Sequence, residues 1–211
     1  MTLRISNLSC VRGETSLFHE VNLDIECGDA VRVIGPNGIG KTSLLKTLCG
    51  LMLPATGQVL WNNANIHAEN QTYSDHLVFL GHANGLSEEL QTWENLLTLC
   101  ECSGLDISRQ QAIDALQASG LLHIANLPIR VLSQGQRRRV ALTRLYLSLS
   151  KKIWLLDEPF AALDTAAINL LCHLVNRFLA SGGIVIYTTH QEVKLDPVRA
   201  QFLSLESGAT C

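Results

Sequence analysis

A run near the start of the chain has the residue types and spacing of a phosphate-binding loop. It comprises Gly35, Pro36, Asn37, Gly38, Ile39, Gly40, Lys41, Thr42 and Ser43. Glycines let backbone N–H groups approach phosphate oxygens closely, and a helix that begins here would add its positive end. Lys41 would then contact the β- and γ-phosphates, and the Thr42 hydroxyl would ligate Mg²⁺. A glycine-rich turn without a ligand is the alternative, which the preceding apolar strand and the following helix disfavour.

A second group of chemically capable residues follows a buried apolar run. Residues 153–156 read Ile-Trp-Leu-Leu and are followed by Asp157 and Glu158. A parallel strand that ends in carboxylates places them at the sheet edge where α/β proteins bind ligands. Asp157 is suited to hold Mg²⁺ through its water shell, and Glu158 to act as general base on an attacking water. An exposed acidic turn is the alternative, but the phosphate loop in the same chain favours the catalytic interpretation.

Composition sets the broad class. The 211 residues are 47% hydrophobic and 17% charged, with a formal net charge of −3, so one α/β domain with a real core is expected and no global field attracts nucleic acid. The seven cysteines are scattered, and Cys100-x-Cys102 lacks the second pair that zinc would need, so reduced thiols are expected. We expect no signal peptide and no membrane span, because no apolar run is long enough.

Apolar patterning outlines the elements that must position these residues. Strand-like runs cover residues 3–8, 21–25, 30–34, 58–61, 77–80, 153–156 and 184–188, and a closing strand and turn is expected at 202–208. Helical periodicity covers 42–51, 170–179 and stretches between 87 and 149, among them 113–122 and 134–149. The pattern predicts an α/β fold: a phosphate-loop core with a mostly parallel sheet and an N-terminal antiparallel portion. A helical subdomain at about 83–147 is inserted, and residues 1–211 form a single domain.

One further motif distinguishes among phosphate-loop proteins. Leu132-Ser133-Gln134-Gly135-Gln136, followed by three arginines at 137–139, resembles the signature sequence of the ATP-binding-cassette (ABC) family. Ser133 has the character of a helix cap, so the N–H groups after it would form a second anion site. The arginine run could be a nucleic-acid patch, but a solvated helix face needs no partner and is the favoured interpretation.

The resemblance covers essentially the whole chain and implies specific roles. The ligands would be ATP and Mg²⁺, and Ser133, Gly135 and Gln136 would close over the γ-phosphate held by a second copy of the chain. The sequence Ala162-Leu163-Asp164 resembles the family's loop that couples the two ATP sites, which implies that role for Asp164. His190 lies where the family has a switch histidine that contacts the γ-phosphate and orients the water and Glu158.

Two positions depart from the family pattern. Most members have a glutamine where this chain has His82, and we expect His82 to replace it, a purely structural histidine being the alternative. An aromatic residue usually stacks on adenine near the position of Arg12. A guanidinium plane can also stack on a base, but a surface arginine is the alternative.

These departures resemble one branch of the family, the ATPases of cytochrome c biogenesis. Arg12-Gly13, Leu80-Gly81-His82, residues 41–46 and the end of the chain at Cys211 carry that resemblance. It implies an ATPase on the cytoplasmic face of the bacterial inner membrane that drives integral membrane subunits in haem export or in release of a haem-loaded chaperone. The stretch between His82 and Glu94 is the expected contact with those subunits.

Two alternative functions are weighed against this one. A cassette that moves another substrate has the same ATP site. A soluble cassette ATPase of DNA repair or translation usually carries a long coiled-coil insertion or two cassettes in one chain, and neither pattern is seen here.

Overall fold

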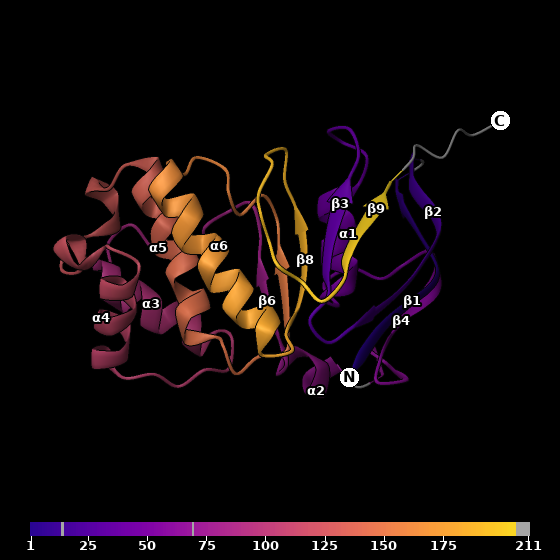
Figure 1. The fold of residues 1–211 in the computed structure, drawn as a ribbon, viewed down its shortest axis with the longest axis horizontal. Helices are drawn as coiled ribbons and strands as arrows, with labels where there is room; N and C mark the ends of the chain where they lie inside the picture. The colour runs from indigo at the N-terminus through magenta and orange to yellow at the C-terminus, as the bar shows by residue number, and fades with distance from the viewer. Residues whose placement is uncertain (14, 69, 206–211) are drawn as a thin grey trace.

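The computed structural model describes residues 1–13, 15–68 and 70–205, which form two β-sheets and a group of helices (Figure 1). An antiparallel sheet has the order β2-β1-β4-β5, with β1 at Thr2–Arg12, β2 at Thr15–Glu26, β4 at Thr56–Trp61 and β5 at Ala64–Asn65. A parallel sheet has the order β6-β7-β8-β3-β9, with β3 at Ala30–Ile34, β6 at Leu77–Leu80, β7 at Ile153–Leu156, β8 at Ile184–Thr188 and β9 at Ala200–Ser204. The predicted fold class is confirmed.

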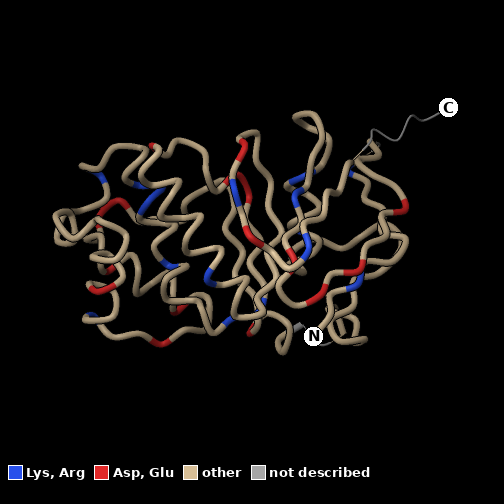
Figure 2. Tube along the Cα trace, in the orientation of Figure 1, with Lys and Arg blue, Asp and Glu red and all other residues tan. Residues whose placement is uncertain are grey.

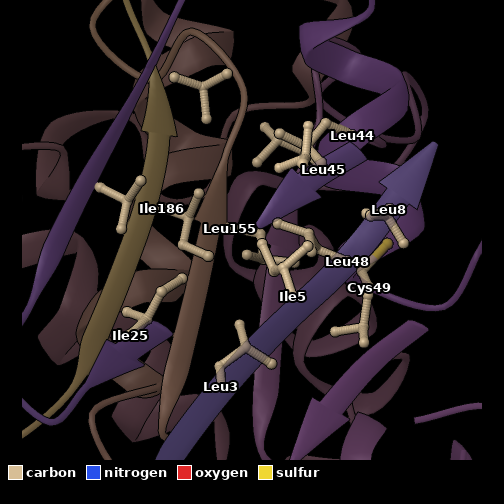
Figure 3. Close-up of a cluster of buried hydrophobic side chains, with 14 of the residues drawn as sticks. Leu3, Ile5, Leu8, Ile25, Leu44, Leu45, Leu48, Cys49, Leu155 and Ile186 are labelled. Atoms are coloured by element: carbon tan, nitrogen blue, oxygen red, sulfur yellow. The ribbon is translucent and has the colours of Figure 1, made fainter. Parts of the chain in front are cut away.

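The first core lies where the antiparallel sheet, the parallel sheet and α1 (Lys41–Leu48) meet. Figure 3 shows Leu3, Ile5 and Leu8 of β1 pointing toward Leu44 and Leu48 of α1, and all five side chains are at most 2% exposed. Trp61 of β4 packs edge-on to Tyr73, with ring centroids 6.1 Å apart. This packing fixes α1, and with it the loop before α1, between two sheets.

A second core covers the other face of the parallel sheet. Every side chain of β7 and β8 is buried, as expected for central strands of a parallel sheet with both faces covered. Helix α6 (Thr165–Ala180) packs here, and its Phe178 stacks on Trp154 of β7 with ring centroids 3.8 Å apart. The carboxyl ends of β3, β7 and β8 are therefore held at a defined edge.

Helices α3, α4 and α5 form a separate cluster beside the parallel sheet (Figure 1). Helix α3 spans Thr92–Glu101, α4 spans Arg109–Ala118 and α5 spans Gln134–Leu147, with 3₁₀ turns at Leu122–Ile124 and Ile129–Val131 between α4 and α5. The Arg109 guanidinium lies 4.5 Å from the ring centroid of Trp93, which links α4 to α3. Helix α2 (Asn70–Ser74) lies outside this cluster and leads into β6. We call α3, α4, α5 and their connections the helical subdomain.

Several predicted boundaries were too short. Strands β1 and β2 continue to Arg12 and Thr15, since the hairpin pairing extends through Val11 and Ser16. Helix α4 begins at Arg109 rather than 113 because Ser108 and Gln111 form a capping box. The closing strand and turn were expected at 202–208. The strand there is β9, which spans Ala200–Ser204, and residues 206–208 lie outside the described part.

Figure 2 shows acidic and basic residues interspersed across the sheets and the helical subdomain. Within residues 1–13, 15–68 and 70–205, the helices are too short or too polar to cross a membrane. The cysteines there, at positions 10, 27, 49, 100, 102 and 172, are free thiols, and burial raises the pKa of Cys49 and Cys100 to about 11.

Candidate ATP site

The phosphate loop joins β3 to α1 in a conformation that depends on glycine. Gly40, directly before α1, has φ of 112°, and a Cβ there would lie 2.9 Å from the Cβ of Leu17. Positive φ is open to glycine and costly for other residues, so Gly40 lets the chain enter the helix here. The Lys41 ammonium donates to the carbonyls of Gly35 at 2.8 Å and Pro36 at 3.1 Å, so it lies over the loop.

Thr42 and Asp157 are brought together although they are far apart in the sequence. The Thr42 hydroxyl donates to Asp157 Oδ2 at 2.7 Å, and the Thr188 hydroxyl donates to Asp157 Oδ1 at 2.8 Å. Asp157 is 3% exposed. A carboxylate and a hydroxyl side by side at the start of a phosphate-loop helix are hard oxygen donors of the kind that Mg²⁺ takes together with phosphates and water. The residues present therefore fit the predicted ion.

Glu158 is held by its backbone rather than by a partner for its carboxylate. Its φ is 48°, and its N–H donates to the Thr188 hydroxyl at 2.8 Å. The carboxylate is 21% exposed, and its Oε1 lies 3.6 Å from Nε2 of His190. The same Nε2 is 3.0 Å from Oδ1 of Asn37 in the phosphate loop. Glu158 and His190 therefore lie together beside the phosphate loop, and their catalytic roles stay predictions.

These residues surround one cavity of about 380 Å³. Both departures from the family pattern, Arg12 and His82, line this cavity. The other lining residues are Leu17, Asn37, Gly38, Gly40, Lys41, Thr42, Ser43, Asp157, Glu158 and His190. The stacking of Arg12 on adenine and the replacement of the family's glutamine by His82 stay predictions.

The signature residues lie elsewhere. Ser133, Gly135, Gln136 and Asp164 are not among the described residues that line the cavity. Ser133 caps α5 as predicted: its hydroxyl accepts from the N–H of Gln136 at 3.2 Å, and the Gln136 side chain accepts from the N–H of Ser133 at 2.9 Å. Asp164 caps α6 by accepting from the N–H of Ala167 at 2.7 Å. The first turns of α5 and α6 are thus capped, but their capping residues do not line the ATP cavity of the same chain.

The arginine run is not a solvated helix face, and that expectation was wrong. Arg138 is only 6% exposed, and Arg137 and Arg139 are half-buried. Arg139 donates to the carbonyl of Ser119 at 2.9 Å, and Arg137 donates to the carbonyl of Leu132 at 3.0 Å. Guanidinium groups offer five donors, so backbone carbonyls of neighbouring segments can draw them inward. Sequence reasoning missed this, and it also missed Thr188, whose hydroxyl stands at the carboxyl end of the strand next to β7.

Known proteins resemble this chain over nearly its full length. A family model described as ABC transporter matches residues 18–161. The cytochrome c biogenesis ATP-binding export protein CcmA of Nitrosomonas europaea is 46% identical over 203 residues, which cover 96% of this chain and 95% of that protein. The protein of the same description from Haemophilus influenzae is 43% identical, with 90% of each chain covered.

Solved structures agree in fold. A Pyrococcus furiosus protein described as an ABC transporter ATP-binding protein superposes with a TM-score of 0.81 at 27% identity, covering 96% of this chain and 98% of its own. A dimeric ATP-binding cassette in a post-hydrolysis state with ADP and phosphate superposes with a TM-score of 0.80 at 25% identity, covering 97% of this chain and 96% of its own. This chain is a member of the ABC transporter ATPase family, in the group of the cytochrome c biogenesis ATP-binding export proteins.

Proposed function

We propose that this chain hydrolyses ATP with Mg²⁺ and drives a membrane complex of cytochrome c biogenesis, in haem export or in release of a haem-loaded chaperone. The observation that carries the enzymatic part is the meeting of three elements at one cavity. The phosphate loop, the Thr42–Asp157 pair and the Glu158–His190 pair all line it. The group of relatives supports the cytochrome c part.

Binding relies on the loop and on Lys41. The backbone N–H groups of the loop and the start of α1 attract the phosphates, and the Lys41 ammonium supplies a compact positive charge beside them. The Thr42 hydroxyl and the Asp157 carboxylate would hold Mg²⁺, which when bound would neutralise negative charge on the phosphate oxygens. Thr188 keeps Asp157 in place by donating to its other oxygen.

Glu158 and His190 act on the attacking water. The Glu158 side chain is 21% exposed, so water reaches its carboxylate, which can accept a proton as the water attacks the γ-phosphorus. His190, 3.6 Å from Glu158 and 3.0 Å from Asn37, stands between the base and the phosphate loop. From there it can hydrogen-bond the γ-phosphate and orient the water.

The second half of each site would come from another copy of the chain. Ser133 and Gln134 are exposed at the start of α5, and the positive N-terminal end of this helix suits an anion. A structural relative is described as a dimer of cassettes. We therefore place Ser133, Gly135 and Gln136 on the γ-phosphate bound by the partner copy, and Asp164 in the loop that couples the two ATP sites.

The membrane partner would contact the segment between His82 and Glu94. Most of its residues from 82 to 89 are exposed, and it begins at the ATP cavity. The buried Asn95 side chain holds the segment in shape: its oxygen accepts from the N–H of Ser87 at 2.7 Å, and its nitrogen donates to the carbonyls of Ser87 and Leu90 at 3.1 Å. A segment that is exposed, ordered and tied to the cavity suits a coupling contact.

Site-specific photocrosslinking in the native membrane complex tests this contact. A photoreactive residue at Ala83 or Ser87 should crosslink to an integral membrane subunit, because both positions are exposed on the segment. The control position is Asn62, which is exposed on the antiparallel sheet and should not crosslink. Crosslinks from Asn62 but from neither segment position would contradict the placement.

Deletion of the gene, followed by haem staining of denatured c-type cytochromes, tests the cellular role. Covalent haem should be lost, and the wild-type gene should restore it while a Glu158→Gln gene should not. In cell fractionation, the protein should be recovered with the inner membrane. It should be accessible to protease only from the cytoplasmic side. Full haem attachment in the deletion strain would refute the cytochrome c role and favour a cassette for another substrate.

A further inference from the structure

Arg138 lies at the junction of three parts of the ATP site. One nitrogen, Nη2, donates to the backbone carbonyls of Asp157 and Glu158, both at 2.9 Å. The other, Nη1, donates to the carbonyl of Gly81 and to Oδ1 of Asn84, both at 3.1 Å. Arg138 itself belongs to α5, the helix that Ser133 caps. One side chain thus joins the carboxylate segment, the His82 segment and the signature helix.

The burial of Arg138 makes these bonds consequential. The residue is 6% exposed, and burial lowers the pKa of its guanidinium while the charges of Asp157 and Glu158 oppose that effect. Without this guanidinium, the four oxygens that accept from it would each lose a charge-assisted hydrogen bond, and water could replace it only poorly at such a buried position. Arg144, six residues further along α5, likewise donates to the carbonyl of Phe79 at the end of β6. The helix is therefore fixed to the sheet edge at two points.

The backbone at Glu158 needs such support. Its φ of 48° lies in the left-handed region, which is unfavourable for a residue with a side chain. The Thr188 hydroxyl accepts from the Glu158 N–H, and Arg138 donates to the Glu158 carbonyl. Both sides of this residue are thereby fixed, which sets the direction in which its carboxylate leaves the backbone.

We infer that Arg138 is a positioning residue for ATP hydrolysis: it orients the general base Glu158 and holds the His82 segment in register with α5. The inference rests on the proposed ATPase function. Arg138 is not among the described residues that line the ATP cavity, so its action reaches the reaction through Glu158 and the His82 segment. Because α5 begins with the residues assigned to the partner's γ-phosphate, the same guanidinium connects each chain's own base to the site of its partner.

Steady-state kinetics of Arg138→Gln in the full chain, within its membrane complex, test the inference. Loss of alignment at the base should lower kcat by about 10- to 100-fold, whereas the KM and Kd for ATP should stay within about three-fold of wild type. Arg138→Lys keeps the charge but not the two-sided fork, so its kcat should lie between the two. The matched control is Arg139→Gln on the same helix, which loses a bond to Ser119 inside the helical subdomain and should keep kcat within about two-fold.

A double-mutant cycle with Glu158→Gln separates positioning from general structural support. If Arg138 acts through Glu158, adding Arg138→Gln to Glu158→Gln should lower the residual single-turnover rate by less than about three-fold. Additive losses in the cycle, a loss confined to KM, or an unchanged kcat would each overturn the inference. Should Arg138→Gln fail to fold, Arg138→Lys is put through the same cycle. Failure of the wild-type complex to hydrolyse ATP would refute the proposed function. Wild-type hydrolysis together with an unchanged kcat in Arg138→Gln would refute only the positioning role of Arg138.

Discussion

Glu158→Gln is expected to lower ATP turnover by about 10²- to 10⁴-fold, the range that a general base contributes. The substitution keeps the size of the side chain and the two backbone bonds of residue 158, to Thr188 and Arg138. What it removes is the ability to accept the water proton beside His190. Equilibrium ATP binding should therefore stay within about two-fold of wild type, and phosphate release should be the measured quantity. Because bound ATP is then not hydrolysed, dimers of the chain that hold ATP between the two copies should persist. Size-exclusion chromatography should show them as a larger dimer peak than for the wild type.

Glu26→Gln is the matched control for this variant. Glu26 is exposed at the end of β2, away from the ATP cavity and from the segment between His82 and Glu94, and loss of its charge should leave turnover unchanged. Should Glu158→Gln turn over ATP at the wild-type rate while Glu26→Gln does the same, another group must take the proton, and the assignment of Glu158 is refuted.

Asp157→Asn is expected to lower turnover by about 10²-fold or more at low millimolar Mg²⁺, since it removes the carboxylate from the ion's donor set. Asp157 accepts from the hydroxyls of Thr42 and Thr188, one on each oxygen. An amide nitrogen in place of one oxygen cannot accept, so one hydroxyl must turn or lose its partner. The variant should thus weaken the ion site and loosen the contact between α1 and the parallel sheet.

Titration of ATPase activity with Mg²⁺ measures this effect. The half-saturating Mg²⁺ concentration should rise at least several-fold in Asp157→Asn. ATP binding measured in EDTA serves as the internal control and should change little, because the loop and Lys41 are untouched. An unchanged Mg²⁺ requirement together with full activity would show that Asp157 does not hold the ion.

In the parallel sheet, β3, β6, β7 and β8 could be predicted from the sequence to the residue, whereas the closing strand was expected at 202–208 and β9 spans Ala200–Ser204. Ile153–Leu156 and Ile184–Thr188 are continuous apolar runs because both faces of these strands are covered, and polar residues end them. The hairpin of β1 and β2 was predicted too short because buried and exposed positions come in pairs there rather than alternating, and the register shifts at Leu8, Cys10 and Val11. There the pairing with the neighbouring strand, rather than hydrophobicity, decides where a strand ends.

The residues of the ATP site likewise fall into those that the sequence predicts and those that only the structure reveals. Lys41, Asp157 and Glu158 could be proposed because their chemistry depends on local spacing. The role of Arg138 depends on carbonyl groups about 20 and 57 positions away, and every residue supplies a carbonyl, so the sequence carries no mark of them. Thr188 is a similar case, since its importance follows from the adjacency of β7 and β8. Sheet order had to be known before either residue could be assigned.

The three tryptophans are distributed so that each lies in a different part of the molecule. Trp61 lies in the antiparallel sheet against Tyr73, and Trp154 lies in the parallel sheet against Phe178 of α6. Trp93 lies beneath the Arg109 guanidinium in the helical subdomain. Variants that retain a single tryptophan would therefore give separate fluorescence signals from the three parts. A rotation of the helical subdomain on nucleotide binding would change the emission of Trp93 and leave that of Trp61 constant, so that the chain contains its own optical reporter and its own reference.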